Sequence, residues 1–113
     1  MPIMIGFNEQ RRRLLQQELA RMLENLPQLG IEKAILVGPM AEGDVDSSSS
    51  IELVIVQETN APFAARANFF YSHLEPRVGL QAYVYTPEEF EEIGTNDSPI
   101  SRALQRGIVV YDG

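Results

Sequence analysis

The chain has 113 residues, no cysteine, and nine basic against sixteen acidic side chains, which give a formal net charge of −7. The length suits a single domain, residues 1–113. The lack of cysteine excludes disulfides, thiol nucleophiles and cysteine metal sites. The negative charge argues against nucleic acid as a partner, because phosphate binding needs basic patches. No signal peptide and no apolar run that could span a bilayer is visible, so we expect a cytoplasmic protein without a membrane partner.

The N-terminal third predicts one amphipathic helix over residues 9–25, which Asn8 caps and which Pro27 and Gly30 end. Its basic run, residues 11–13, is interpreted as a solvated helix face. The apolar stripe recurs at three- and four-residue spacings and comprises Leu15, Leu19, Met22, Leu23 and Leu26.

Four short segments rich in β-branched and apolar residues predict strands. They are residues 33–38, 51–56, 80–85 and 107–113. Because the first two strands follow each other closely, a regular parallel doubly wound sheet does not fit. The element order predicts an α+β fold, in which a small mixed sheet is packed with helices.

Three further helices are expected between and after these strands. The first begins near Pro62, with an inward face made of Phe63, Ala67, Phe70 and Leu74. The second opens with a capping box formed by Thr86 and Glu89. The third starts at residues 98–99 and closes at Gly107.

The segment between residues 37 and 56, VGPMAEGDVDSSSSIELVIV, has a glycine turn and a polar loop between two strands. It resembles the minimal nucleotidyltransferases of the polymerase-beta-like superfamily, whose frame is G-S-x-A-x-G-D, a polar loop, and S-D-[IL]-D-L-[LV]-[VI]. The matching residues are Gly38, Ala41, Gly43, Asp44, Ile51, Leu53, Val54 and Ile55. Residues 83–92 and 98–113 are similar to the family's closing strand, capped helix and G-[IV]-x-[LV]-Y end. The resemblance covers nearly the whole chain and implies a nucleotidyltransferase-like fold.

The resemblance also implies where a nucleotide would bind. In the family, backbone N–H groups of the glycine turn and a serine hydroxyl hold a triphosphate. The corresponding positions here form a degenerate set, Gly38, Pro39, Glu42 and Gly43. Pro39 replaces the serine and has neither a hydroxyl nor a backbone N–H. Glu42 places a negative charge where arginine is frequent in the family.

The family's three metal-binding carboxylates, which hold two Mg²⁺ ions, fall on Ser50, Glu52 and Gln81. At most one carboxylate is therefore left, and no residue is assigned a catalytic role. Glu52 and Asp44 remain weak metal candidates, and together with Asp46 they could form a displaced site. Asp44 and Asp46 are more typical of turn residues that hydrogen-bond locally.

Three functions stay open. The favoured one is a non-catalytic, antitoxin-like pseudoenzyme that needs no cofactor and binds a protein, either a helical HEPN-type protein or a second copy in a homo-oligomer. The second is an active nucleotidyltransferase that uses Mg²⁺ to move a nucleotide from a nucleoside triphosphate to a protein or small acceptor. The third is a regulatory module that binds nucleotide without chemistry.

Overall fold

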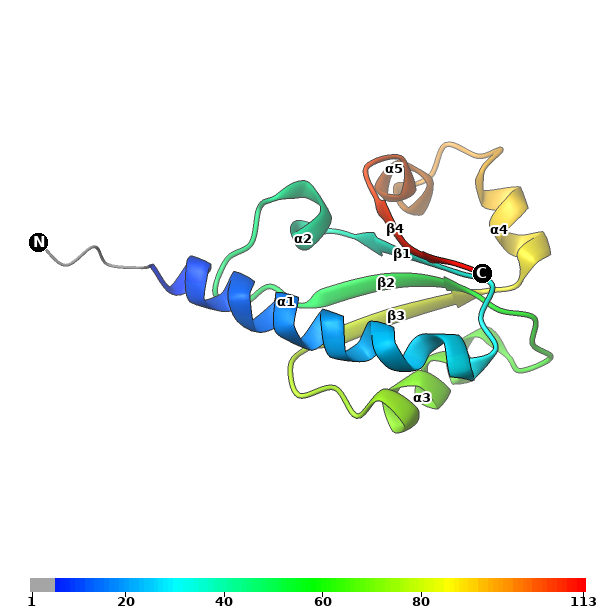
Figure 1. Ribbon diagram of the computed structural model, residues 1–113. Helices are drawn as coiled ribbons and strands as arrows, with labels where there is room; N and C mark the ends of the chain where they lie inside the picture. The colour runs from blue at the N-terminus through cyan, green and yellow to red at the C-terminus, as the bar shows by residue number, and fades with distance from the viewer. Residues whose placement is uncertain (1–5) are drawn as a thin grey trace, which may run out of the picture.

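The computed structural model describes residues 6–113; residues 1–5, part of the opening segment in which we expect no signal peptide, lie outside the described residues. The elements in chain order are α1 (Phe7–Asn25), the 3-10 turn η1 (Leu26–Leu29), β1 (Lys33–Val37), α2 (Pro39–Glu42), β2 (Ile51–Val56), α3 (Phe63–Leu74), β3 (Leu80–Tyr85), α4 (Pro87–Ile93), α5 (Pro99–Gln105) and β4 (Ile108–Asp112) (Figure 1). Within residues 6–113, no helix combines the length and the apolar character needed to cross a bilayer.

The strands form a mixed sheet in the order β3-β2-β1-β4. Strand β1 runs antiparallel to both β2 and β4, whereas β2 and β3 are parallel and are connected through α3. Gly107 brings the chain into β4, and a Cβ atom there would lie 2.7 Å from Cγ2 of Ile35 and 3.0 Å from the carbonyl oxygen of Leu36. Glycine at this position therefore lets the last strand approach β1 closely. The predicted α+β class is confirmed.

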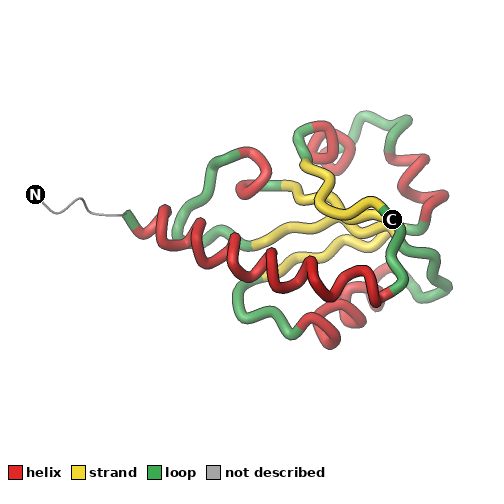
Figure 2. Tube along the Cα trace, in the orientation of Figure 1, coloured by secondary structure: helices red, strands yellow, loops and turns green. Residues whose placement is uncertain are grey.

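Helices cover both faces of the sheet (Figures 1 and 2). On one face, α1 and α3 enclose the larger core, whose biggest fully buried side chains include Leu15, Met22, Leu53, Ile55 and Phe70. On the other face, α4 and α5 cover a smaller cluster around Ile35, Val37 and Val54. The alternation of side chains along β1, β2 and β3 explains why neighbouring residues belong to different clusters. In β4, a shift of register opposite Ala34 and Ile35 leaves the neighbours Val110 and Tyr111 on the same cluster.

The predicted apolar stripe of α1 faces the larger core, with Leu23 partly buried at its margin. The predicted N-cap is wrong: Asn8 lies inside the helix, and Gly6 occupies the N-cap position without a side-chain hydrogen bond. The predicted end is close to the observed one, since Pro27 lies in the first turn of η1 and Gly30 ends it in the left-handed conformation.

An ion pair between the buried Glu18 and the partly exposed Arg21 attaches α1 to the loop between α3 and β3. Arg21 donates to both carboxylate oxygens of Glu18, at 2.8 and 2.9 Å, and also to the carbonyl oxygens of Leu74 and Glu75. The backbone N–H of Arg77 donates to the same carboxylate. Hydrogen bonding by Arg21 is the main reason why the pKa of Glu18 falls from 4.5 to about 2.

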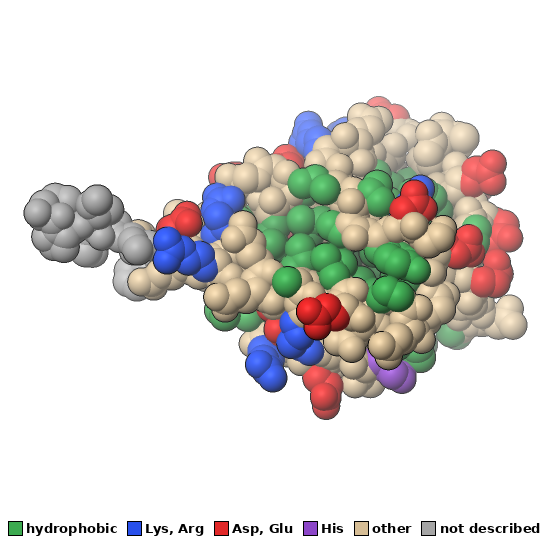
Figure 3. Space-filling model, in the orientation of Figure 1, with side chains coloured by type: hydrophobic (Ala, Val, Ile, Leu, Met, Phe, Trp, Pro, Cys, Tyr) green, Lys and Arg blue, Asp and Glu red, His purple; other side chains and the backbone are tan. Residues whose placement is uncertain are grey.

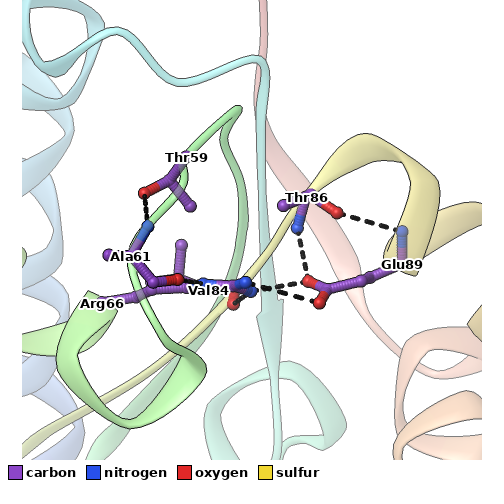
Figure 4. A network of polar contacts seen from close by, with 6 residues as sticks. All are labelled: Thr59, Ala61, Arg66, Val84, Thr86 and Glu89. Carbon is purple, nitrogen blue, oxygen red and sulfur yellow. Dashed lines mark hydrogen bonds and ion pairs between the residues drawn. The ribbon is translucent and has the colours of Figure 1, made fainter.

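A second polar network joins α3, the end of β3 and the start of α4 (Figure 4). The side chain of Arg66 donates to the carbonyl oxygens of Ala61 and Val84 and to the carboxylate of Glu89, at 2.6 Å. Glu89 also accepts from the backbone N–H of Thr86, whose hydroxyl accepts in return from the N–H of Glu89. The predicted capping box is therefore confirmed, and it is tied to α3 by an arginine.

Phe63 is the one member of the predicted inward face of α3 that lies outside the core. Its side chain is half exposed, and its ring centroid lies 5.3 Å from that of Tyr85, with the guanidinium of Arg66 5.6 Å away. Phe70 and Leu74 are buried as predicted, and Ala67 packs at the core margin. The first turn of α3 thus projects beyond the larger core, while later turns lie on the sheet.

We predict that replacement of Leu19 by alanine lowers the free energy of unfolding by about 2–5 kcal/mol, because it removes a side chain that is only 9% exposed from the core. Urea unfolding monitored by circular dichroism measures this change. The matched control is Leu14→Ala on the same helix, where the side chain is 45% exposed and the expected loss is below about 0.5 kcal/mol. Equal losses for the two variants would contradict the packing of α1.

We further predict an acid-sensitive contribution from Glu18. Its pKa in the folded chain lies below the ordinary value, so its stabilisation is present above about pH 4.5 and is lost as the pH falls toward 2. Glu18→Gln should be less stable at neutral pH and should lose less on acidification, with slopes differing by at most about 1.4 kcal/mol per pH unit. Unfolding curves at several pH values measure this, with the exposed Glu24→Gln on the same helix as control. Parallel stability curves for the original chain and Glu18→Gln would refute the prediction.

Candidate functional site

The glycine turn at the end of β1 is the first part of the candidate site. Gly38 has φ 74° and ψ −153°, a conformation that favours glycine, and it is followed by the single-turn helix α2 with Pro39 at its start. Gly43, with φ 76°, closes that turn. The sequence reading missed α2 as a helix, although Pro39 and Gly43 are typical start and end residues. Because Pro39 has no backbone N–H, the turn lacks one of the donors that could hold an anion.

The polar loop between α2 and β2 is held by arginines of α1. Arg11 donates from Nε to the carbonyl oxygen of Ser49 at 2.8 Å, and Arg12 donates to that of Gly43 at 3.4 Å. The interpretation of the basic run as a purely solvated face is therefore wrong for these two residues. The third arginine of the run, Arg13, has an exposed side chain, and within residues 6–113 its ion-pair partner is Glu9 of the same helix.

The loop also has its own local structure, centred on Asp46. Its Oδ1 atom accepts from the backbone N–H and hydroxyl of Ser48 and from the hydroxyl of Ser49. These hydrogen bonds, chiefly those from Ser48, lower the pKa of Asp46. The arrangement is that of a turn residue, as the sequence favoured. Asp44 is exposed.

The three positions that correspond to the family's acids lie together. Glu52 and Gln81 are direct partners in the parallel pairing of β2 with β3. Ser50 precedes Glu52 by two residues, so both belong to the same face of the sheet. A Cβ atom on Gly79 would lie 2.9 Å from that of Ser50, which shows how closely the chain before β3 approaches this residue.

The carboxylate of Glu52 lies against the glycine turn. A Cβ atom on Gly38 would be 2.7 Å from Oε2 of Glu52 and 3.1 Å from Oε1, and Glu52 is also the partner of Val37 in the β1–β2 ladder. The sequence reading missed this contact. The sequence feature that could have indicated the contact is the glutamate itself. Its side chain is one methylene longer than that of aspartate, so its carboxylate reaches further from β2.

Tyr83 is a second residue that the sequence reading missed. Its hydroxyl donates to Oε1 of Gln81 at 2.7 Å, so the one amide atom that could bind a metal already accepts a hydrogen bond. Burial, and then the negative charge of Glu52, raise the pKa of Tyr83. The two-residue spacing of Gln81 and Tyr83 on one strand was the available signal.

Glu42 is the last residue of α2 and faces a basic residue near the C-terminal end of α5. Its carboxylate is 3.7 Å from Nη1 of Arg106, and both side chains are substantially exposed. An exposed pair at this distance contributes little to stability. Glu42 therefore brings a negative charge to the end of α2, beside Gly43, that is only weakly offset.

The residues present do not fit the two Mg²⁺ ions of the family. Ser50, Glu52 and Gln81 offer one carboxylate, one hydroxyl and one amide oxygen that is already hydrogen-bonded, whereas Mg²⁺ in proteins is bound through carboxylates. Among residues 6–113, no three histidine, aspartate or glutamate side chains are grouped so that they could hold a metal ion. The weak candidates Glu52 and Asp44 belong to no such group.

A cavity of about 470 Å³ lies at the opposite end of the sheet and is lined by Lys33, Val56, Phe90 and Tyr111, among others. Lys33 pairs with Val56, while Glu52 pairs with Val37 at the far end of the same ladder. This cavity therefore belongs to a different part of the molecule from the glycine turn.

The chain matches no protein-family model and no curated protein sequence. It is similar in structure to a crystal structure described as a "putative nucleotidyltransferase from Sulfolobus solfataricus", with a TM-score of 0.56 and 14% sequence identity. The match covers 94% of this chain and 84% of the other. The chain therefore has a nucleotidyltransferase-like fold, which confirms the expectation drawn from the sequence. At this identity the similarity concerns the fold alone.

We predict that calorimetric titration with Mg²⁺ or Mn²⁺ gives no binding at millimolar metal. The physical reason is that Glu52 is the only carboxylate among the three acid positions. Glu52→Gln serves as the reference for non-specific heat, because it removes that remaining charge while keeping a similar shape. A micromolar binding site in the original chain that disappears in Glu52→Gln would contradict the prediction.

Proposed function

We propose that this chain is a nucleotidyltransferase-like protein without nucleotidyl transfer at its glycine turn, and that it acts by binding another protein. It is a pseudoenzyme in this sense. The observation that carries the proposal is the position of the Glu52 carboxylate against Gly38. A carboxylate, rather than a hydrogen-bond donor, lies next to the turn that would have to bind a triphosphate.

The charges at the three acid positions support the proposed absence of nucleotidyl transfer. Two of the three acid positions, Ser50 and Gln81, are neutral. A pair of unit charges at 4 Å is worth about 4 kcal/mol at an effective dielectric constant near 20. The loss of two such ligands removes most of the attraction for a divalent cation. Without the cation, the developing charge of a phosphoryl transition state lacks its main stabilisation.

The same charges weaken nucleotide binding without chemistry. The Glu52 carboxylate lies against Gly38, Glu42 directly precedes Gly43, and Pro39 provides no N–H donor. A triphosphate brought to this turn meets two carboxylates and one weakly engaged cation, Arg106. Binding of a polyanion is therefore disfavoured.

Protein binding is supported by the surface. The net charge of −7 favours a partner or a partner surface with basic side chains. Among the side chains that the structure describes, five large apolar ones are at least 40% exposed: Leu14, Phe63, Phe69, Ile108 and Val109. Exposed apolar residues near one another are typical of contact surfaces. A HEPN-type protein or a second copy of this chain remains a proposed partner.

We predict that metal binding returns when the acids are restored. The variant carries Ser50→Asp, Glu52→Asp and Gln81→Asp, with Pro39→Ser and Glu42→Arg to remove the obstacles at the turn. Positions 52 and 81 are direct partners on adjacent strands, so three aspartates should converge. Mg²⁺ or Mn²⁺ should then raise the melting temperature of the variant by mass action. Without metal, crowding of three negative charges should make the variant less stable than the original.

The matched control replaces the same three acid positions by asparagine, which keeps the size but not the charge. Its melting temperature should not respond to metal. If the aspartate variant folds and its melting temperature also ignores metal, the assignment of positions 50, 52 and 81 is wrong. If metal stabilises the original chain, the proposal of a non-catalytic protein is wrong. Stabilisation of the original by a triphosphate alone would favour a nucleotide-binding module instead.

A further inference from the structure

The cavity at the far end of the sheet has the size of a small-molecule site. Its volume of about 470 Å³ lies within the range of roughly 300–1,000 Å³ that is typical of such sites. Most of its wall is apolar or aromatic and comes from Ile31, Val56, Pro87, Phe90 and Tyr111. Apolar side chains also reach the surface between α1 and the end of β4 (Figures 1 and 3). The wall of the cavity is therefore suited to cover an apolar group.

The wall is held in place by backbone hydrogen bonds and by the start of α4. The N–H of Glu32 donates to the carbonyl oxygen of Val56 at 2.8 Å, and the N–H of Gly113 donates to that of Glu32 at 2.9 Å. Pro87, the first residue of α4, directly follows the capping box of Thr86. Since these segments are already ordered, a ligand spends little binding free energy on ordering them.

The positive charge of the cavity belongs to Lys33, which is the only lysine in the chain. Its side chain is partly buried, and its ammonium lies 5.9 Å from the centroid of the Phe90 ring. Among residues 6–113, no carboxylate lies within ion-pair distance of this ammonium. An ammonium that is partly removed from water is stabilised by a counter-charge, so Lys33 favours a ligand that carries a carboxylate.

Two carboxylates, those of Glu32 and Asp112, line the same cavity and are exposed to solvent. Asp112 is the direct partner of Lys33 in the β1–β4 ladder, so the two side chains belong to the same face, with Cβ atoms about 5 Å apart. The lining thus carries one positive and two negative side chains, which disfavours a ligand that is only an anion. A ligand with an ammonium group next to its carboxylate is complementary to both signs.

We propose that this cavity binds a free α-amino acid with an apolar side chain. Lys33 pairs with the carboxylate, Asp112 and Glu32 attract the ammonium group, and the wall around Phe90 covers the side chain. A single carbon atom separates the two charged groups of an amino acid, which suits the closely spaced cross-strand pair of Lys33 and Asp112. The inference goes beyond the proposed function, because it gives the protein a small-molecule ligand at the end of the sheet that is remote from the glycine turn.

Calorimetric titration of the full chain with L-leucine and L-phenylalanine tests the inference. We expect a submillimolar dissociation constant for at least one of these probes. The analogues without the ammonium group, isocaproate and phenylpropionate, and those without the carboxylate, isoamylamine and phenethylamine, should bind at least roughly tenfold more weakly than the parent amino acid. Glycine, which has no side chain to cover, should give no measurable binding.

Variants of the charged residues locate the site. Lys33→Met keeps much of the side chain but removes its charge, and it should abolish binding. Arg13→Met, which removes an exposed cation of α1, is the matched control and should leave the dissociation constant unchanged. Asp112→Asn should weaken binding of the amino acid by roughly tenfold without weakening binding of the carboxylate analogue. Circular dichroism verifies that each variant is folded.

The single lysine gives a second readout on the original chain, which is independent of any variant. The bound amino acid should slow the acylation of Lys33 by an amine-reactive ester, as followed by peptide mass spectrometry. Absence of binding at millimolar amino acid, undiminished binding by Lys33→Met, equal affinity for the amino acid and its carboxylate analogue, or binding without protection of Lys33 would overturn the inference. These readouts involve no metal, triphosphate or partner protein, so failure here is distinguishable from failure of the proposed function.

Discussion

Parallel pairing of β2 with β3 is the constraint on which the rest of the structure depends. Parallel neighbours cannot be joined by a tight turn, so the chain must cross over one face of the sheet through α3. That crossover buries Phe70 and Leu74 in the larger core, and Arg21 and Arg66 fasten its two ends to α1 and α4. The same pairing places residues 52 and 81 side by side and thereby defines the candidate site.

The frame of the fold and the chemistry of the site depend on different residues. Buried residues such as Leu53 and Ile55 and the turn glycines Gly38 and Gly43 determine where β2 and the turn lie. None of these groups is a carboxylate, so the backbone arrangement does not depend on acidic residues at positions 50 and 81. The neutral residues at positions 50 and 81 also avoid the repulsion that three neighbouring carboxylates would create. This fold and neutral residues at positions 50 and 81 are therefore compatible in one stable chain.

Much of the fold could be predicted because it follows from local patterns in the sequence. Periodicity identified α1 and the strands, and the Thr86 capping box marked the start of α4. The site was predicted as a set of positions, since i, i+2 spacing and family spacing are properties of the sequence. What was missed depends on contacts between distant segments: Arg11 with Ser49, and Glu52 with Gly38. The prediction that Phe63 faces inward was wrong, because helical periodicity does not indicate where the sheet beneath α3 ends.

The hydrogen bond that the N–H of Ala82 donates to the hydroxyl of Tyr71 affects how readily the protein can misassemble. An outer strand whose amides point to water can recruit a strand from another molecule by small fluctuations. Here the Tyr71 hydroxyl covers the amide of Ala82, and a displacement of α3 that removed it would also uncover Phe70 and Leu74. Opening of this edge is thus coupled to a large sub-global unfolding step, with slow amide exchange as its signature. The packing of α3 thus protects β3 against pairing with a strand of another molecule, in addition to what the strand's own sequence does.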